Sequence, residues 1–345
     1  MARVTTAALG SEPSMTEAAN AILAKAGTSV DACIAAFFAA AGAQEGVLLG
    51  SVVMLVAGTG SGAHVFDGSV VQPGRGVPRP RGFTQDSEVP VSARIGVSAT
   101  GAVLAAVHAH GGSTPMSELA TPGVKIARAC RAPGRANLIR RVSAAGPVAL
   151  REASFVRSLL DVAGRPEGGN VTTEDLEEVQ ARVLQPTMGE GVLFVEAPAS
   201  RLSIPALRTV VLVACDHRGV LAAMHCAYDT DGVNVEPHEV TASRLAAPVL
   251  RGVPRIRPGT PIELPIPIGL LTDRDIPWAA VGLEGVFHVD WDRLAGRIAP
   301  DLTLEQSLRM LVAEAGPDRR ALAVARGLRA DDVPRVHDIK SGAVG

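Results

Sequence analysis

The residues best suited to acid–base chemistry lie in one short stretch, around His225 and Asp229. Residues 220–228 are predicted to form a strand, so side chains four positions apart lie on one face of it. An imidazole and a carboxylate on one face can pass a proton between a substrate and the protein. A histidine at a strand end with an acid in the next turn is also a common structural pair, and both interpretations stay open.

Other reactive arrangements do not fit known patterns. The order of Glu236, His238 and Glu239 is not that of a zinc-binding helix motif. The glycine-rich residues 58–62 are not followed by the lysine of a phosphate-binding loop. The four cysteines lie far apart without a CxxC pair, which indicates small buried hydrophobic side chains. The sequence therefore predicts no metal ion and no cofactor.

The elements that position the acid–base pair change in type along the chain. Helical spacing is predicted over residues 16–25, 30–41, 101–109, 116–132 and 149–162. Strands are predicted over residues 47–57, 64–66, 69–71, 209–215, 220–228, 262–271 and 278–281. Helical spacing returns at residues 304–315 and 319–326. Helices, then strands, then helices predict an α+β protein with a pair of sheets between helices.

Composition indicates a globular protein with a large core. The chain has 345 residues, of which 47% are hydrophobic and 20% charged, and a net charge of −2. Such a charge gives no electrostatic reason to bind nucleic acid or a membrane, and no run is long and apolar enough to span a bilayer. The N-terminus has no long apolar segment typical of a secretion signal, so a cytoplasmic location is expected. Assembly into a homo-oligomer is left open.

The preference for arginine over lysine indicates the type of genome that encodes the chain. Lysine occurs only at Lys25, Lys125 and Lys340 among 33 basic residues. This preference for arginine, together with abundant alanine and glycine, is typical of a GC-rich genome such as that of an actinobacterium.

Three segments carry a family resemblance. Residues 11–42, SEPSMTEAANAILAKAGTSVDACIAAFFAAAG, residues 96–119, GVSATGAVLAAVHAHGGSTPMSEL, and residues 169–183, GNVTTEDLEEVQARV, resemble signature segments of the gamma-glutamyltranspeptidase family. The resemblance covers nearly the whole chain in outline, in a shortened and strongly diverged form. It implies a four-layer αββα sandwich of the N-terminal-nucleophile hydrolase type. It also implies a single domain over residues 1–345, with residues 1–208 like the family's large subunit and residues 209–345 like its small one.

The resemblance implies a threonine nucleophile. Members of this family cleave themselves before a threonine, whose hydroxyl then attacks the substrate while its free α-amine acts as the base. The family motif Thr-Thr-His-x-Ser-Val-Val-Asp-x-x-Gly falls without gaps on residues 209–219. Thr209, Asp216 and Gly219 match, but valines replace the second threonine, the histidine (at Val211) and the serine. Because β-branched residues are common in strands, Thr209 is also compatible with a purely structural role.

The substrate-binding motifs depart further from the family. Residues 66–73 match the segment that carries the substrate-binding arginine, but they contain no arginine, and Ser69 is the substrate-binding candidate in this segment. Residues 261–267 place Glu263 where the family has a serine pair, and a carboxylate there would repel a substrate carboxylate. Glutathione is therefore not expected to be a substrate.

The remaining site residues follow from two further matches. Residues 282–287 resemble the family's oxyanion motif, which implies that the Gly285 and Val286 amides stabilise the developing negative charge. Asp229 matches an asparagine that follows the second strand and is expected to position the substrate. His225 and Tyr228, its neighbours on that strand, are expected to contact the substrate.

The sequence leaves three functions open. The leading prediction is an enzyme that breaks an amide or other acyl bond of a small molecule, in specialised metabolism, with Thr209 as nucleophile. The second is a non-catalytic protein that keeps the scaffold and serves a partner. The third is an uncleaved enzyme that uses Asp229, His225 or Glu263 for acid–base chemistry such as a cyclisation or an elimination. Cleavage before Thr209 separates the first function from the other two.

Overall fold

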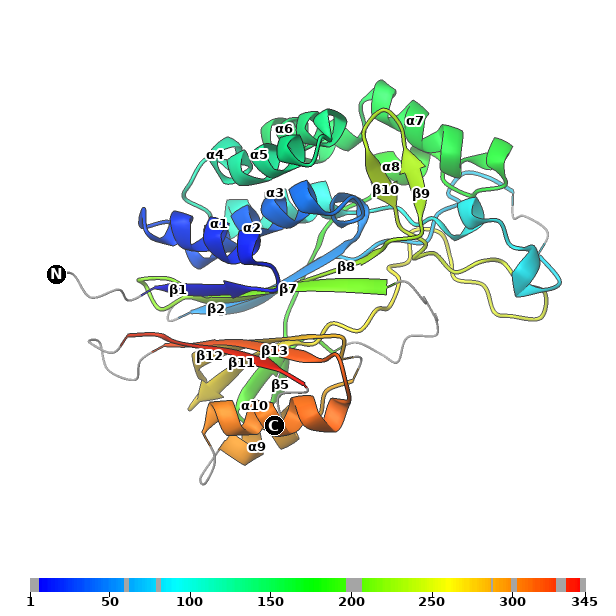
Figure 1. The fold of residues 1–345 in the computed structure, drawn as a ribbon. Helices are drawn as coiled ribbons and strands as arrows, with labels where there is room; N and C mark the ends of the chain where they lie inside the picture. The colour runs from blue at the N-terminus through cyan, green and yellow to red at the C-terminus, as the bar shows by residue number, and fades with distance from the viewer. Residues whose placement is uncertain are drawn as a thin grey trace.

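Two β-sheets face each other, and helices cover the outer side of each (Figure 1). The structure is a computed structural model that describes residues 6–58, 62–78, 82–196, 207–286, 288–298, 303–326 and 333–341. The expected mixture of helices and strands is confirmed. Within the described residues, no helix is long and apolar enough to cross a membrane.

The first sheet is antiparallel throughout, with the strand order β1-β7-β8-β2-β3-β4 among the described residues. Its strands are β1 (Ala7–Gly10), β2 (Ser51–Gly58), β3 (Gly62–Gly68), β4 (Arg182–Leu184), β7 (Leu207–Cys215) and β8 (Leu221–Asp229). The hairpin of β7 and β8 at its centre confirms the predicted strand pair around the turn at Asp216.

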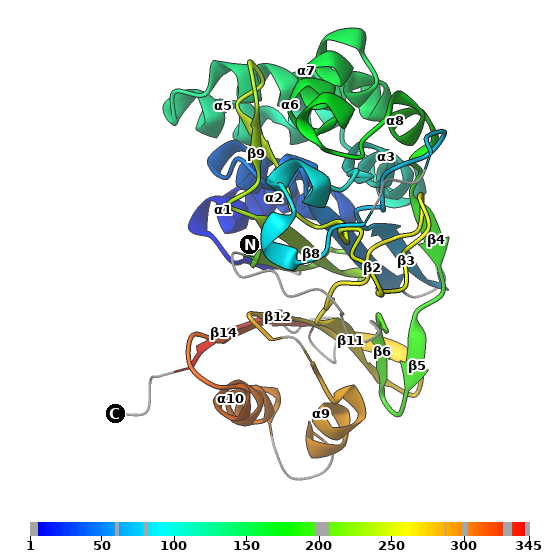
Figure 2. The ribbon, with the colours of Figure 1, turned by 90° about the vertical axis from the view of Figure 1, so that its right-hand side faces the viewer.

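The second sheet is also antiparallel, with the order β14-β13-β12-β11-β6-β5 in the part of the chain that the structure describes. Its strands are β5 (Thr187–Gly189), β6 (Val192–Phe194), β11 (Ile268–Asp273), β12 (Ile276–Glu284), β13 (Arg320–Ala325) and β14 (Arg335–Lys340). A separate short ladder joins β9 (Val233–Val235) to β10 (Val240–Ala242) beside the helical layer (Figure 2).

The helices fall into two groups (Figures 1 and 2). Those above the first sheet are α1 (Pro13–Leu23), α2 (Ser29–Ala43), α3 (Thr100–Gly111), α4 (Met116–Leu119), α5 (Thr121–Ala129), α6 (Pro133–Ala145), α7 (Ala153–Ala163) and α8 (Thr173–Glu178). Those below the second sheet are α9 (Trp291–Ile298) and α10 (Leu304–Ala315).

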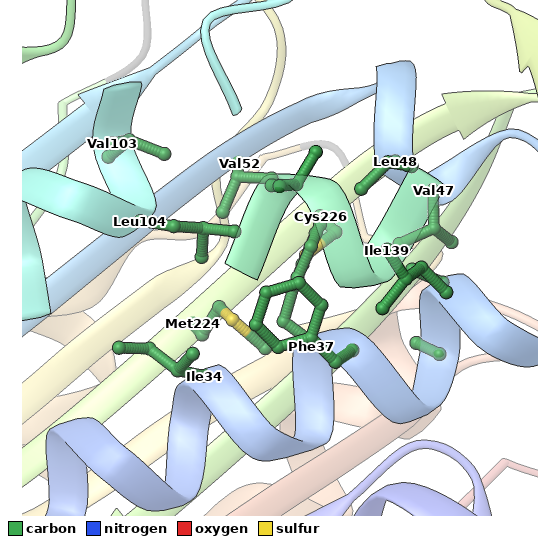
Figure 3. Close-up of a cluster of buried hydrophobic side chains, with 14 of the residues drawn as sticks. Ile34, Phe37, Val47, Leu48, Val52, Val103, Leu104, Ile139, Met224 and Cys226 are labelled. Carbon is green, nitrogen blue, oxygen red and sulfur yellow. The ribbon is translucent and has the colours of Figure 1, made fainter. Parts of the chain in front are cut away.

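Helix α2 is buried on every side because it lies between the first sheet and other helices. Figure 3 shows its side chains Ile34 and Phe37 packed against Met224 and Cys226 of β8. Such burial requires a helix that is apolar all round, as the sequence predicts. A long apolar helix of this kind still has to satisfy the free amides of its first turn.

The first turn of α2 is closed by one buried carboxylate. Asp31 accepts hydrogen bonds from the backbone amide of Thr28, completing a capping box with the Thr28 hydroxyl. It also accepts from the amides and hydroxyls of Ser113 and Thr114, in the turn after α3. Thr28 is therefore the cap residue, and Asp31 ties α2 to α3.

Alternate residues of β7 serve two different cores. Val210, Leu212 and Ala214 pack against the helices, whereas Val211 and its alternate neighbours pack against the second sheet. At Gly282 of β12, an added Cβ atom would lie 2.1 Å from Cγ1 of Val211. Glycine is needed there because the two sheets approach too closely for a side chain.

Two predicted elements are corrected. Residues 319–326 are not a helix, because Arg320–Ala325 form β13 at the inside of the second sheet. The apolar run of β13 is rich in alanine and has no clear period. Contacts with the neighbouring strands therefore determine its structure, rather than its local pattern. The strand predicted from residue 47 begins at Ser51, after a 3-10 turn over Val47–Leu49.

The Asp31 cap generates a stability prediction. Burial raises the pKa of Asp31, but the hydrogen bonds from Thr28, Ser113 and Thr114 outweigh it, so the pKa lies below its usual value. The ionised form is thus favoured by folding. We expect Asp31→Asn to lower the free energy of unfolding at pH 7 by about 1–3 kcal/mol, because the amide cannot accept all these bonds.

The pH dependence provides the check. Stability from a lowered carboxyl pKa is present above the unfolded value of about 3.9 and is lost as pH falls through the folded value. Urea unfolding of wild type and Asp31→Asn should therefore differ at pH 7 and converge below about pH 4. Glu17→Gln on the exposed side of α1 is the matched control and should stay within about 0.5 kcal/mol of wild type. An equal loss in both variants would contradict the prediction.

Candidate active site

Thr209 lies near the start of β7, on the side of the first sheet that faces the second sheet. It is the third residue of the strand and is partly buried. Val211, two residues later and therefore on the same face, packs in the core between the sheets. The Thr209 side chain thus lies at one end of the space between the sheets. The first three residues of β7 are at least partly exposed there, and the following residues are buried.

Strand β8 brings the predicted residues His225 and Asp229 to the same face. Thr209 pairs directly with Ala227, and the two polar residues lie two positions to either side of Ala227. Diagonal neighbours of this kind are separated by roughly 7–8 Å between Cα atoms, within reach of long side chains. Thr209, His225 and Asp229 therefore lie near one another on the face towards the second sheet.

His225 is fully enclosed and neutral. Its cross-strand partners are Val211 of β7 and Val53 of β2, and its Nε2 atom has no hydrogen-bond partner among the described residues. Burial lowers the pKa of His225 to about 4. The family resemblance expects a histidine at the position of Val211. The imidazole found here belongs instead to His225, on the adjacent strand.

Asp229 is bound by an arginine. Arg244 donates from both Nε and Nη2 to its two carboxylate oxygens, the second bond at 3.0 Å, and also lies 3.4 Å from Asp231. The side chain of Asp229 is completely buried. Burial raises the pKa of Asp229, but the hydrogen bonds from Arg244 and the Asp231 amide outweigh it and hold the pKa below its usual value. Asp229 is therefore ionised, with its charge balanced by Arg244, and is not a proton acceptor.

Two serines extend the line of residues across the sheet. Ser51 of β2 pairs with Ala227, on the other side from Thr209. The predicted residue Ser69 directly follows β3, one residue beyond the pair of Val52 and Gly68, and so lies beside Ser51. Its amide donates to the carboxylate of Asp67 at 2.8 Å.

The second sheet contributes an acidic group at the same end of the sandwich. Glu284, two residues beyond Gly282 on β12, contacts Ser11, which bonds both the amide (2.6 Å) and the carbonyl (3.1 Å) of Val211. Arg320 lies 3.4 Å from Glu284. Burial raises the pKa of Glu284, and the contacts with Ser11 and Arg320 oppose this only in part.

The predicted oxyanion residues follow this strand. Gly285 has a φ angle of +70°, a conformation that favours glycine, and turns the chain out of β12. The Val286 side chain is buried in the outer core, between the second sheet and α9 and α10. Phe287, the last residue of the motif, lies outside the described residues.

Two predicted residues are not brought to this face. Tyr228 points to the helices, where it packs with the core around α2, and burial, with Glu12 nearby, raises its pKa to about 12. Glu263 is exposed between the buried residues Ile262 and Leu264, so its side chain faces away from them.

Sequence reasoning missed Arg244, Ser51, Ser11 and Glu284. Arg244 lies fifteen residues from Asp229 across the β9–β10 ladder, a separation with no periodicity that could reveal it. Ser51 could have been found, because its position follows once β2 is paired with β8. In the described part of the chain, no group of three or more histidine, cysteine, aspartate or glutamate residues is placed to hold a metal ion.

Comparison with solved structures places this geometry in a known fold. LmbA2991T421A has a TM-score of 0.75 at 13% identity, and LmbA2991HD has 0.74 at 14%, each over 97% of this chain and 96% of the other. Cephalosporin acylase from Bacillus halodurans has a TM-score of 0.68 at 13% identity over the same shares. The chain shares their fold. The mixture of helices and sheets that the sequence resemblance implied is part of the fold that these structures share.

The sequence itself is far diverged. No family model and no curated protein sequence matches the chain. The likeness in three dimensions therefore shows the fold alone.

The Arg244–Asp229 pair generates the second prediction. Arg244→Met leaves a buried carboxylate unpaired, so we expect the free energy of unfolding to fall by about 3–5 kcal/mol. Adding Asp229→Asn removes the unpaired charge and should recover most of this loss. Chemical denaturation of the single and double variants measures both effects.

An exposed ion pair serves as control. Arg309→Met breaks the pair with Glu305 on α10, where both side chains are about half exposed, and should lower stability far less than Arg244→Met because solvent screens an exposed pair. If Arg244→Met and Arg309→Met cost the same, Asp229 is not the buried charge described here.

The enclosed imidazole generates the third prediction. A pKa lowered from 6.5 to about 4 means that only the unfolded chain binds a proton in this interval. Wild-type stability should therefore fall by about 3 kcal/mol as pH drops from 6.5 to 4 through this group alone. In His225→Leu, this fall in stability between pH 6.5 and 4 should disappear. In His217→Leu, which alters the exposed turn before β8, the fall should remain. Thermal or urea unfolding between pH 6.5 and 4 measures the effect. If stability falls with pH equally in wild type and His225→Leu, the low pKa of His225 is refuted.

Proposed function

We propose that the protein is an amidohydrolase or acyltransferase whose nucleophile is Thr209, made available by self-cleavage of the Arg208–Thr209 bond. The observation that carries the proposal is the place of Thr209 on the inner face near the start of β7, beside His225 and Asp229. The shared fold, which includes an acylase among its known members, supports it. Glutathione is not the substrate we propose, because residues 66–73 contain no arginine.

Self-cleavage would proceed by a shift of the acyl group from nitrogen to oxygen. The Thr209 hydroxyl adds to the carbonyl carbon of Arg208, the bond to the Thr209 nitrogen breaks, and the nitrogen takes the hydroxyl proton, which leaves an ester and a free α-amine. Water hydrolyses this ester, which releases residues 1–208 with a terminal carboxylate and restores the Thr209 hydroxyl. The amine can then accept the proton of the hydroxyl when a substrate is attacked. The amides of Gly285 and Val286 would donate to the oxyanion.

A second candidate arises from the chain before the threonine. Leu207 and Arg208 continue β7 and pair with Asp229 and Tyr228 of β8, so the bond to be cleaved lies inside a regular ladder. In a chain that stays uncut, Thr209 has no free amine and loses its base. Acid–base chemistry would then fall to Glu284, whose raised pKa suits proton exchange.

The experiment is intact-protein mass spectrometry of the full chain, fresh and after prolonged incubation. We expect two fragments, residues 1–208 and 209–345, in wild type and in Thr209→Ser, which keeps a hydroxyl nucleophile. Thr209→Ala should remain one chain because it has no nucleophile. Thr187→Ala, which alters another partly buried strand threonine, should be cleaved as wild type is. A single uncut chain in every sample would sink the threonine mechanism and favour Glu284.

A further inference from the structure

An apolar cluster lies directly beside Thr209. Ala227, the cross-strand partner of Thr209, is one of its buried members. The others come from three separate loops at this end of the first sheet: Val70, Leu245, Ile262 and Leu264. The amide of Ile262 donates to the carbonyl of Val70 at 2.8 Å, which fixes one loop against another. The five members of the cluster are buried, and the loops that carry them are held together by backbone hydrogen bonds.

Leu207 packs on this cluster and is only partly buried. It precedes Thr209 by two residues in the same strand, so its side chain points to the same face. In the self-cleavage that we propose, the first acyl group transferred to the Thr209 hydroxyl is the chain's own, ending in Leu207 and Arg208. The place of Leu207 thus indicates where an acyl group extends when its carbonyl is bound to Thr209.

Among the described residues, the charged side chains that lie across the strand from Leu207 are already paired. Asp229, the cross-strand partner of Leu207, has both carboxylate oxygens bound by Arg244. Arg244 is in turn shared with Asp231. Glu263 faces outward, and His225 is enclosed. A charged acyl group would lose its hydration here without gaining a partner.

We propose that the acyl group accepted by Thr209 is uncharged and apolar, and that it occupies the place of Leu207 on the cluster of Val70, Ala227, Leu245, Ile262 and Leu264. This inference rests on the proposed function. In the reaction, Thr209 Oγ bonds to the acyl carbon, the amide C–N bond breaks, and the leaving amine takes the proton that the Thr209 α-amine received from the hydroxyl. Water then hydrolyses the ester, releasing an apolar carboxylic acid.

The test measures kcat/KM of the cleaved protein for acetyl, butyryl, hexanoyl and octanoyl p-nitroanilides, with γ-glutamyl p-nitroanilide in parallel. We expect kcat/KM to rise by up to about fourfold for each added methylene until the cluster is covered. The γ-glutamyl compound should react at least about tenfold more slowly than the butyryl compound, because its charges are buried without partners.

Two variants locate the effect. Leu264→Ala enlarges the site and should move the optimum to longer acyl chains, while Ala227→Val narrows it and should cut octanoyl turnover more than acetyl turnover. Leu308→Ala removes an equally buried leucine from α10, in the outer core, and should leave the ratio between chain lengths unchanged. Because ratios are compared within one protein, loss of stability in a variant does not imitate the effect.

The outcomes keep the two proposals apart. Hydrolysis that is lost in Thr209→Ala but is independent of chain length, or fastest with the γ-glutamyl compound, would overturn the apolar site and leave the threonine mechanism standing. Turnover of no anilide, with the chain uncut, would remove both proposals. Chain-length dependence that shifts with Leu264→Ala and not with Leu308→Ala would establish the site.

Discussion

The register between β7 and β8 is the constraint on which the rest depends. It places Thr209 opposite Ala227 and Val211 opposite His225, so that alternate side chains serve the helical core and the core between the sheets. A slip by one residue would turn the Thr209 hydroxyl towards the helices and bury the wrong set of valines. The close approach of Gly282 to Val211 locks this register, because only one face of β7 fits against the glycine.

Burial in a dry interior determines which polar groups can react. Asp229 keeps its charge because Arg244 and the Asp231 amide stabilise it, whereas burial keeps His225 uncharged and its Nε2 has no partner among the described residues. Glu284 lies between these limits, since Arg320 and Ser11 compensate it in part. The three groups therefore differ in electrostatic environment although all three belong to the same sandwich, and strongly perturbed groups of this kind gather at functional sites.

The sequence predicted the elements whose signals are local. The apolar helix α2 and the β7–β8 hairpin were found because their periodicity and turn residues lie within one short window. Strand β13 was mistaken for a helix because Ala321 and its neighbours have no clear period.

The site was predicted in part, for the same reason. His225 and Asp229 were placed on one face by strand spacing alone, whereas Arg244 and Glu284 reach the site through tertiary contacts. No local pattern encodes those contacts. The exposure of Glu263 and the inward turn of Tyr228 likewise depend on loops and helices packed from elsewhere in the chain.

The order of the strands has a consequence for a chain divided before Thr209. In the first sheet, β7 and β8 lie between β1 and β2, which come from the earlier part of the chain. In the second sheet, β11 lies beside β6, again from the earlier part. Each half thus supplies strands whose hydrogen-bonding partners belong to the other half, and neither half holds a complete sheet. The two fragments would remain one interleaved folding unit that migrates as a single particle until it is denatured.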